Sequence, residues 1–261
     1  MSAPTTPGAA RLRGIGVVLT RPRVQSEPVA AALAAAGARV IVFPTLDIVP
    51  TPLDAPSQSS LEALPGSALA IFVSANAVEH GLAAARQRGP WPAEVPVATV
   101  GLATAAQLRR EGFETVIAPA GRFDSEALLA LLPPGSLRGR RVVIFRGVGG
   151  REHLRQSLSA QGAEVRYVEC YRRVRPAGDA RPVREAVLAG RVQAVQAMSA
   201  ESLDNLLAIA GDDLPWSQVA LVVPHPAIAR RPAATAFARA LVTEPGTPAL
   251  EAALATLRPA A

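Results

Sequence analysis

Hydrophobic positions along this chain alternate between short runs rich in β-branched residues and longer stretches rich in alanine and leucine. The short runs predict strands, because about four to eight apolar residues bounded by turn residues are typical of buried strands. These runs are Gly16–Leu19, Arg39–Phe43, Ala70–Val73, Val97–Val100, Thr115–Ala118, Arg141–Phe145, Glu164–Tyr171, Ala194–Met198, Val219–Val223 and Ala240–Thr243.

The alanine- and leucine-rich stretches between these runs predict helices. They are Val24–Ala36, Ala75–Arg88, Ala103–Glu111, Ser125–Leu132, Arg151–Gln161, Arg181–Ala189, Ala200–Ala210 and Thr247–Leu257. Six of them stop just before a glycine, which is a common helix end. Strands that alternate with helices predict an α/β fold of parallel sheets with helices on both faces. The proline-rich segments Pro44–Pro56, Pro133–Gly135 and Pro176–Pro182 predict loops.

The chain also nearly repeats itself at a constant separation of 125 residues. The matched pairs are Val17–Arg21 with Val142–Arg146, Gly37–Val40 with Gly162–Val165, and Ser74–Val78 with Ser199–Leu203. Repeated sequence usually means repeated structure. We therefore expect two similar α/β domains, each a parallel sheet flanked by helices, with a cleft between them that holds a small ligand.

Composition limits the class of protein. A length of 261 residues suits two domains of about 100–150 residues each, and 49% hydrophobic residues indicate a folded chain. The single cysteine, Cys170, permits no internal disulfide and fits a reducing cytosol. Residues 1–13 read as a loose leader without the apolar core of a signal peptide, and no run approaches the roughly 18 apolar residues of a membrane span. We expect a cytoplasmic protein that does not bind membranes.

All 27 basic residues are arginine, which a GC-rich genome would also produce, and the net charge is +6. Without lysine the chain can form neither a Schiff base with pyridoxal phosphate nor a P-loop. The arginines are scattered and aromatic residues make up only 4%, which disfavours a nucleic-acid partner. Arginine binds carboxylate or phosphate in a two-pronged geometry, so we expect a small polyanion as ligand. No cysteine or histidine spacing suggests a metal site, and we expect no metal and no cofactor.

Ligands of open parallel sheets lie beyond the carboxyl ends of the strands, so the residues that follow the predicted strands are the candidates for binding. Many are small or carry hydroxyls at helix starts, where backbone N–H groups can hold anions. The candidates are Thr20, Arg21, Ser74, Asn76, Gly101, Thr104, Arg146, Gly149, Gly150, Arg151, Ser199, Ala200 and His225.

Several candidates have two interpretations. The glycine loop at 146–151 lacks the G-x-G-x-x-G spacing of a dinucleotide site. Ser74 and Ser199 could be nucleophiles, but neither lies in G-x-S-x-G and helix N-capping is favoured. Tyr171 is one of only two tyrosines, and its position alone fits a packed side chain as well as a site residue. The arginines after the strands either hold the ligand or only solvate the rim.

Taken together, these segments resemble the uroporphyrinogen-III synthases, over about Gly16 to Leu257. The segments that carry the resemblance are Thr20–Pro22, Phe72–Val78, Val100–Ala105, Arg151–Leu154 and Glu169–Arg172. One departure concerns a late Ser-Pro-x-Thr-Ala motif of the family, which here reads His225–Ala229. Ile228 cannot supply the threonine hydroxyl, and His225 is expected to replace it in part.

The resemblance implies that the domains are not the two tandem halves. One domain comprises residues 1–45 and 176–261, the other comprises residues 48–168, and connector strands join them near 44–47 and 168–173. The strands led by Gly37-Ala38 and Gly162-Ala163 are expected to form this connector.

The resemblance also implies an activity, that of a lyase of haem biosynthesis. Such enzymes cyclise hydroxymethylbilane, a linear tetrapyrrole with eight carboxylates, with inversion of ring D and loss of water. Tyr171 is then the candidate proton donor and Thr104 a substrate contact. We expect a monomer that makes at most transient contact with the preceding pathway enzyme. The alternative from another class is a two-lobed protein that binds a small polyanion and catalyses nothing.

Overall fold

The structure, a computed structural model, describes residues 11–257. Most of the leader expected at residues 1–13 lies outside the described residues. The chain forms two compact units, each built around its own sheet. The first unit contains the described residues up to Asp47 and those from Val174 onward, and the second contains Ile48–Arg173.

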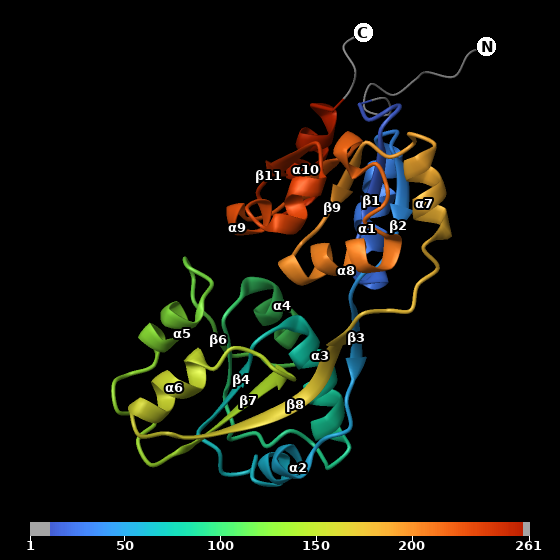
Figure 1. The fold of residues 1–261 in the computed structure, drawn as a ribbon. Coiled ribbons are helices and arrows are strands. Elements are labelled where there is room, and N and C mark those ends of the chain that lie inside the picture. The colour runs from blue at the N-terminus through green and yellow to red at the C-terminus, as the bar shows by residue number, and fades with distance from the viewer. Residues whose placement is uncertain (1–10, 258–261) are drawn as a thin grey trace, which may run out of the picture. The chain divides into compact units, whose positions relative to one another are not determined.

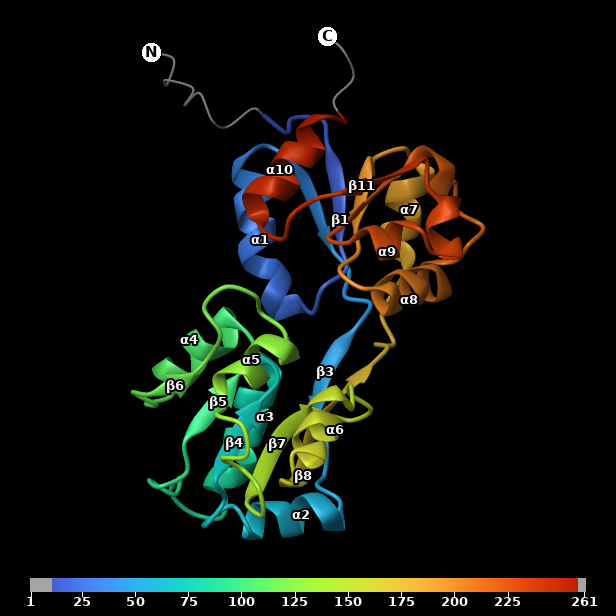
Figure 2. The same cartoon turned by 90° about the vertical axis from the view of Figure 1, so that its left-hand side faces the viewer.

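The first unit is built on a five-stranded parallel sheet in the order β11-β10-β9-β1-β2 (Figure 1). Helices α1 and α10 cover one face of this sheet, and α7, α8 and α9 cover the other (Figure 2). The elements are β1 Gly16–Leu19, α1 Arg23–Ala35, β2 Arg39–Val42, α7 Arg181–Leu188, β9 Ala194–Gln196, α8 Ala200–Ala210, η1 Trp216–Gln218, β10 Ala220–Val223, α9 Pro226–Ala229, η2 Pro232–Ala236, β11 Arg239–Val242 and α10 Thr247–Ala255.

The second unit has a six-stranded sheet in the order β3-β8-β7-β4-β5-β6, in which the pairs from β8 to β6 are parallel. Helices α5 and α6 pack on one face, and α2, α3 and α4 pack on the other. The elements are β3 Asp47–Pro50, α2 Ala55–Glu62, β4 Leu69–Phe72, α3 Ala75–Arg86, β5 Val97–Thr99, α4 Leu102–Arg110, β6 Val116–Ile117, α5 Ser125–Leu131, β7 Arg141–Gly147, α6 His153–Ala160 and β8 Glu164–Val174.

The five strands of the first sheet have the same order as the five strands from β6 to β8 of the second sheet, which explains the sequence repeat. By its position in the sheet, β1 is the equivalent of β7, β2 of β8 and β9 of β4. The second unit therefore has the same doubly wound arrangement with its strands in a permuted chain order. The predicted α/β fold of parallel sheets flanked by helices is confirmed.

Five elements were not predicted from the sequence. Strand β3 and the start of α2 lie in the segment 44–56 that was predicted as a loop, and α9 and the short 3-10 helices η1 and η2 were also missed. Strand β3 is short and ends in proline, so its strand character comes from pairing with β8 rather than from its own pattern. The connector prediction for the strand after Gly37-Ala38 was wrong, because that strand, β2, pairs with β1 inside the first unit.

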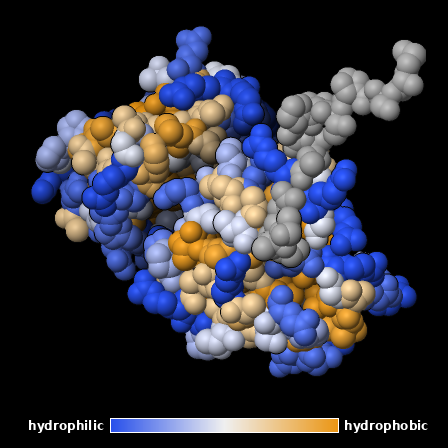
Figure 3. Space-filling view, turned by 90° about the horizontal axis from the view of Figure 1, so that it is seen from above, coloured by the Kyte–Doolittle hydropathy of each residue, from blue (hydrophilic) through white to orange (hydrophobic). Residues whose placement is uncertain are grey.

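Apolar side chains fill the interior of each unit. Each face of each sheet buries its own apolar cluster beneath the helices that cover it. The face drawn in Figure 3 mixes hydrophilic and hydrophobic residues and shows no broad apolar band. Within residues 11–257, no helix has the length and apolar character needed to cross a membrane.

Candidate active site

A cavity of about 420 Å³ opens at the carboxyl ends of β4 and β7 in the second unit. These neighbouring strands form the switch point of the sheet, where chain connections leave toward opposite edges and ligands usually bind. Of the candidates from the sequence, the cavity lining contains Ser74, Arg146, Gly150, Arg151 and Tyr171. A larger cavity, of about 580 Å³, lies among Trp91, Val95 and Phe113 near the amino end of β5, away from this switch point.

Tyr171 and Ser74 form a hydroxyl pair at the cavity. The oxygen of Ser74 and the phenolic oxygen of Tyr171 share a hydrogen bond of 3.1 Å. Ser74 also accepts a hydrogen bond of 3.1 Å from the backbone N–H of Ala77, so it caps the N-terminus of α3. Tyr171 is only 6% exposed, and its ring lies 5.9 Å from the ring of His80 on α3. A phenol is thereby fixed at the edge of a cavity at the start of a helix.

A β-bulge in β8 decides the direction in which Tyr171 points. Arg146 pairs with Glu169, but Gly147 pairs with Tyr171, so Cys170 is the extra residue. In regular alternation Tyr171 would share the face of Tyr167, toward α6. The bulge moves Tyr171 to the opposite face, where it packs in the apolar cluster beneath α3. Tyr171 reaches Ser74 only because of this shift.

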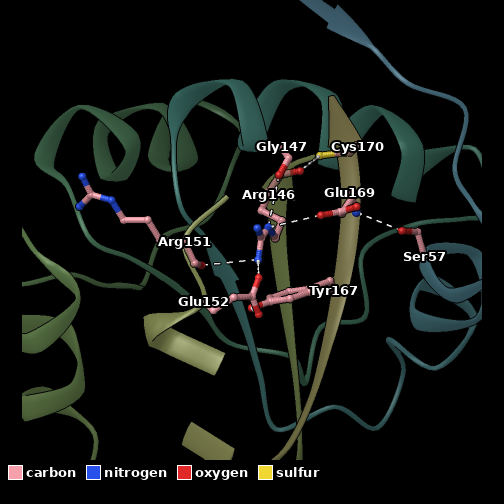
Figure 4. A network of polar contacts seen from close by, with 8 residues as sticks. All are labelled: Ser57, Arg146, Gly147, Arg151, Glu152, Tyr167, Glu169 and Cys170. Carbon is pink, nitrogen blue, oxygen red and sulfur yellow. Dashed lines mark hydrogen bonds and ion pairs between the residues drawn. The ribbon is translucent and has the colours of Figure 1, made fainter. Parts of the chain in front are cut away.

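Arg146 is the centre of a polar network on the other face of the sheet (Figure 4). Its guanidinium forms ion pairs with Glu152 at 2.7 Å and Glu169 at 3.5 Å, and lies 4.2 Å from the centre of the Tyr167 ring. It also donates hydrogen bonds to the carbonyls of Gly147, at 3.2 Å, and Arg151, at 3.5 Å. Arg146 is 3% exposed, so it is a buried charge with several partners.

The network shifts the titration of two of its members. Hydrogen bonds from Arg146 and then Tyr167 hold the pKa of Glu152 below its ordinary value. Burial, together with the hydrogen bond of 2.9 Å that Tyr167 donates to Glu152, raises the pKa of Tyr167 to about 12. Glu152 is therefore ionised and Tyr167 neutral at physiological pH, and the arrangement around Arg146 is a stable charge pairing.

The glycines of the 147–151 loop allow it to pack closely on these side chains. Gly149 has a φ of +70°, a conformation that favours glycine. A Cβ on Gly150 would come within 2.9 Å of the Arg146 guanidinium. Arg151, the next residue, is exposed and lines the cavity. The loop therefore places Arg151 in the cavity lining, while Arg146 supports the loop from inside.

The remaining candidates of the second unit lie at helix starts. Asn76 is in the first turn of α3 and Gly101 is the N-cap of α4. Thr104 is 6% exposed in the first turn of α4, and its hydroxyl oxygen lies 4.0 Å from the place a Gly101 Cβ would occupy. Val100, just before Gly101, belongs to the cavity lining, which places the start of α4 beside the cavity.

The first unit holds the other candidates at the carboxyl ends of β1, β9 and β10. Thr20 is fully buried, with its hydroxyl 2.8 Å from the carbonyl of Gln196 and 2.7 Å from the hydroxyl of Ser202. The Thr20 hydroxyl therefore links the end of β1 to the end of β9. Arg21 donates to the sulfur of Met198 at 3.0 Å, and burial lowers the pKa of Arg21.

Ser199 and His225 in the first unit cap helices as Ser74 does, by accepting a hydrogen bond from a backbone N–H in the first turn. Ser199 accepts a hydrogen bond of 3.1 Å from Ser202 N–H and caps α8, whose first residue is Ala200. His225 caps the short α9 by accepting from Ala227 N–H at 3.0 Å, and its side chain is exposed. The N-capping interpretation of Ser74 and Ser199 is confirmed.

Comparison with known proteins decides the family. The family model described as uroporphyrinogen-III synthase HemD matches residues 27–251. This chain belongs to the uroporphyrinogen-III synthase family. Uroporphyrinogen-III synthase from Escherichia coli K12 is 31% identical over 160 residues, which are 61% of this chain and 65% of that protein. The enzyme of the same name from Synechococcus elongatus is 39% identical over 166 residues, 61% of each chain. These alignments span slightly less than two thirds of the relatives' length.

Solved structures support the same fold. Uroporphyrinogen-III synthetase from Helicobacter pylori 26695 aligns with a TM-score of 0.64 at 15% identity, over 94% of this chain and 100% of that chain. A mutant uroporphyrinogen III synthase from the extremely thermophilic bacterium Thermus thermophilus aligns with a TM-score of 0.56 at 19% identity, over 93% and 95%. The doubly wound α/β architecture of this chain is thus that of uroporphyrinogen-III synthase structures.

Sequence reasoning missed three residues that shape the candidate site. Glu152 and Glu169 hold Arg146, and Tyr167 stacks on it. The alternation of β8 places Tyr167 and Glu169 on one face, which is a signal available from the sequence. Their meeting with Arg146 follows from the register of β7 and β8, which the sequence does not state.

Proposed function

We propose that this chain is a uroporphyrinogen-III synthase that cyclises hydroxymethylbilane with inversion of ring D and loss of water. Membership of the family supports the reaction. The observation that carries the proposal to a particular site is the Tyr171–Ser74 hydroxyl pair at the switch-point cavity. A reaction that expels hydroxide needs a proton donor held beside the departing group, and a neutral phenol can be that donor.

The proposed chemistry balances with Tyr171 as the only acid. The pyrrole nitrogen lone pair of ring A expels the terminal hydroxyl, and the Tyr171 phenol transfers a proton to it, so that water leaves. The substituted α carbon of ring D attacks the resulting methylene to give a spiro intermediate. The bond from this carbon to the methylene bridge of ring C then breaks, and the unsubstituted α carbon of ring D attacks the freed methylene, which inverts ring D and closes the macrocycle. Closure releases one proton from a ring carbon, and this proton restores the phenol. Ser74 orients the Tyr171 hydroxyl through their shared hydrogen bond.

We propose that the enzyme contributes more by selecting isomer III than by transferring the proton, because spontaneous closure gives the isomer in which ring D is not inverted. The cavity lining carries Arg146, Arg151 and Arg173 but also Asp124 and Glu126. Because Arg146 is already paired with Glu152 and Glu169, the other four charges of the lining nearly balance. We therefore propose that the cavity encloses the reacting pyrroles and fixes their geometry, while most carboxylates stay at the rim. Arg151 and the backbone N–H groups at the starts of α3 and α4 are the proposed anion contacts.

The decisive experiment separates the isomers of the product. Purified protein is given enzymatically generated hydroxymethylbilane in a buffer with a chelator and without any added cofactor, the product is oxidised, and uroporphyrins I and III are resolved by chromatography. We expect isomer III to dominate, since we propose that neither metal nor cofactor is needed. Only isomer I at the uncatalysed rate, with substrate binding detected by calorimetry, would favour a non-catalytic binding protein.

The proposed setting is the cytoplasm, where the chain acts as a monomer on a tetrapyrrole polycarboxylate. The buried Cys170, which forms no disulfide, is compatible with a reducing compartment. Sedimentation at the assay concentration tests the monomer.

A further inference from the structure

Resting on the proposed function, we infer that Arg146 is a positioning residue, which holds the 147–151 loop and the seat of Tyr171 without binding the substrate itself. The sequence named Arg146 as a candidate contact to the anionic substrate, with solvation of the rim as the alternative, and the inference differs from both. Three features of the network in Figure 4 lead to this inference: charge, burial and the atoms to which the guanidinium is bonded.

The charge of Arg146 is already matched inside the protein. Glu152 and Glu169 place two carboxylates on one guanidinium. Hydrogen bonds from Arg146 and Tyr167 keep Glu152 ionised by lowering its pKa. The group as a whole therefore has no positive charge with which to attract a polyanion. At 3% exposure, Arg146 also offers almost no surface to a ligand.

The guanidinium is bonded to both ends of the loop. Its Nε donates to the carbonyl of Gly147 and its Nη1 to the carbonyl of Arg151. Gly150 packs directly against the guanidinium, as a Cβ on Gly150 would come within 2.9 Å of it. Arg146 therefore fixes the conformation of the 147–151 loop and, with it, the position of the exposed Arg151.

The same bonds extend to Tyr171. The Gly147 peptide that Arg146 holds is the surface on which the Tyr171 ring lies, with 2.6 Å between the site of a Gly147 Cβ and Tyr171 Cε2. The N–H of Val148 donates a hydrogen bond of 2.9 Å to the carbonyl of Tyr171. A shift of the Gly147–Val148 backbone would therefore displace the proposed proton donor.

Only arginine meets these geometric demands. A planar fork can reach two carbonyls and two carboxylates while its face stacks on Tyr167, whereas lysine is a single point charge. The positioning role thus predicts that Arg146→Lys fails to restore what Arg146→Ala loses. It also predicts that free guanidinium ion, which can occupy the space left in Arg146→Ala, restores activity, whereas urea, of similar shape but neutral, does not.

The test compares Arg146→Ala, Arg146→Lys and Glu152→Gln with the wild type, and Arg140→Gln, at an exposed arginine before β7, is the matched control. For Arg146→Ala we expect kcat for isomer III to fall by about 10²-fold, as for a misplaced catalytic group, with KM nearly unchanged. The salt dependence of kcat/KM should remain that of the wild type. Glu152→Gln should also lower kcat, but by a smaller factor than Arg146→Ala does.

A rise in KM with unchanged kcat, and a loss of salt dependence, would show that Arg146 binds the substrate directly and would overturn the inference. So would wild-type kinetics in every variant. Hydrogen exchange of the amides 147–151 needs no substrate, and we expect it to accelerate in Arg146→Ala and in Glu152→Gln. If the wild type made no isomer III, the proposed function would fail, while unchanged loop exchange would separately disprove the positioning role.

Discussion

The ring of Tyr171 lies so close to the backbone of Gly147 that a Cβ on Gly147 would stand 2.6 Å from Tyr171 Cε2 and 2.7 Å from Cζ. The Tyr171 hydroxyl, at the end of this ring, lies 3.1 Å from the Ser74 oxygen. The position of the phenol is therefore set by a glycine on the neighbouring strand.

This contact makes Gly147→Ala a sharp probe of the site. The added methyl group must displace the Tyr171 ring, so we expect a lower kcat for isomer III and a destabilisation of about 1–3 kcal/mol from overpacking. Gly178→Ala is the control, because a Cβ there meets only Phe43 at an ordinary 3.7 Å. Urea unfolding and the isomer assay would measure both effects. Wild-type activity in Gly147→Ala would mean that the ring position is unimportant for catalysis.

The repeat provides a matched pair of capping serines. Ser74→Ala and Ser199→Ala each remove one N-cap, so we expect each to lower the free energy of unfolding by about 0.5–2 kcal/mol. Only Ser74 touches Tyr171, so only Ser74→Ala should also reduce kcat. Equal kinetic losses in both variants would mean that capping, and not the contact with Tyr171, matters for the rate.

Tyr171→Phe keeps the ring and removes the hydroxyl. Because the ring supplies the packing, we expect a normally folded protein by circular dichroism. Without the proposed acid, isomer III formation should slow by about tenfold or more. A variant that reacts at the wild-type rate would reduce Tyr171 to a packing residue and direct attention to His225, the exposed cap of α9.

Arg151 is exposed at the cavity, unlike Arg146, so its replacement should behave differently. A charge contact made equally in the ground and transition states affects binding only, so we expect Arg151→Ala to raise KM more than it lowers kcat. A rise of about fivefold corresponds to about 1 kcal/mol, as for an exposed pair. Added salt should weaken the wild type more than the variant. An unchanged KM at low salt would show that Arg151 only solvates the rim.

The raised pKa of Tyr167 predicts a loss of stability in base. Its pKa rises from an ordinary value of 10.0 to about 12, because burial and the hydrogen bond to Glu152 favour the neutral phenol. The native state therefore holds the proton more tightly than the unfolded state does. This contribution is complete below about pH 10 and is lost as the pH rises toward 12. The urea midpoint of the wild type should then fall more steeply over this range than that of Tyr167→Phe. Parallel curves for the two proteins would contradict the prediction.

The local pattern of the sequence was sufficient for much of the architecture. The apolar period and the glycines after helices placed most strands and helices within one or two residues, as at β1 Gly16–Leu19 and α8 Ala200–Ala210. The serines at 74 and 199 indicated their helix starts. These features depend on neighbours in the chain, and such short-range interactions can be read from one sequence.

Tertiary structure decided the features that depend on distant partners. Strand β3 forms by pairing with β8, although its own sequence favoured a loop. The bulge at Cys170 turns Tyr171 to the face of α3, and it is defined only by the register between β7 and β8. The same register brings Glu169 and Tyr167 into contact with Arg146. Arg146 is therefore buried, although the sequence placed it among the exposed residues at the strand ends. The sequence alone determined which residues stand at the strand ends. Strand register determined which of them face the cavity, because a one-residue shift in a strand moves a side chain to the opposite face.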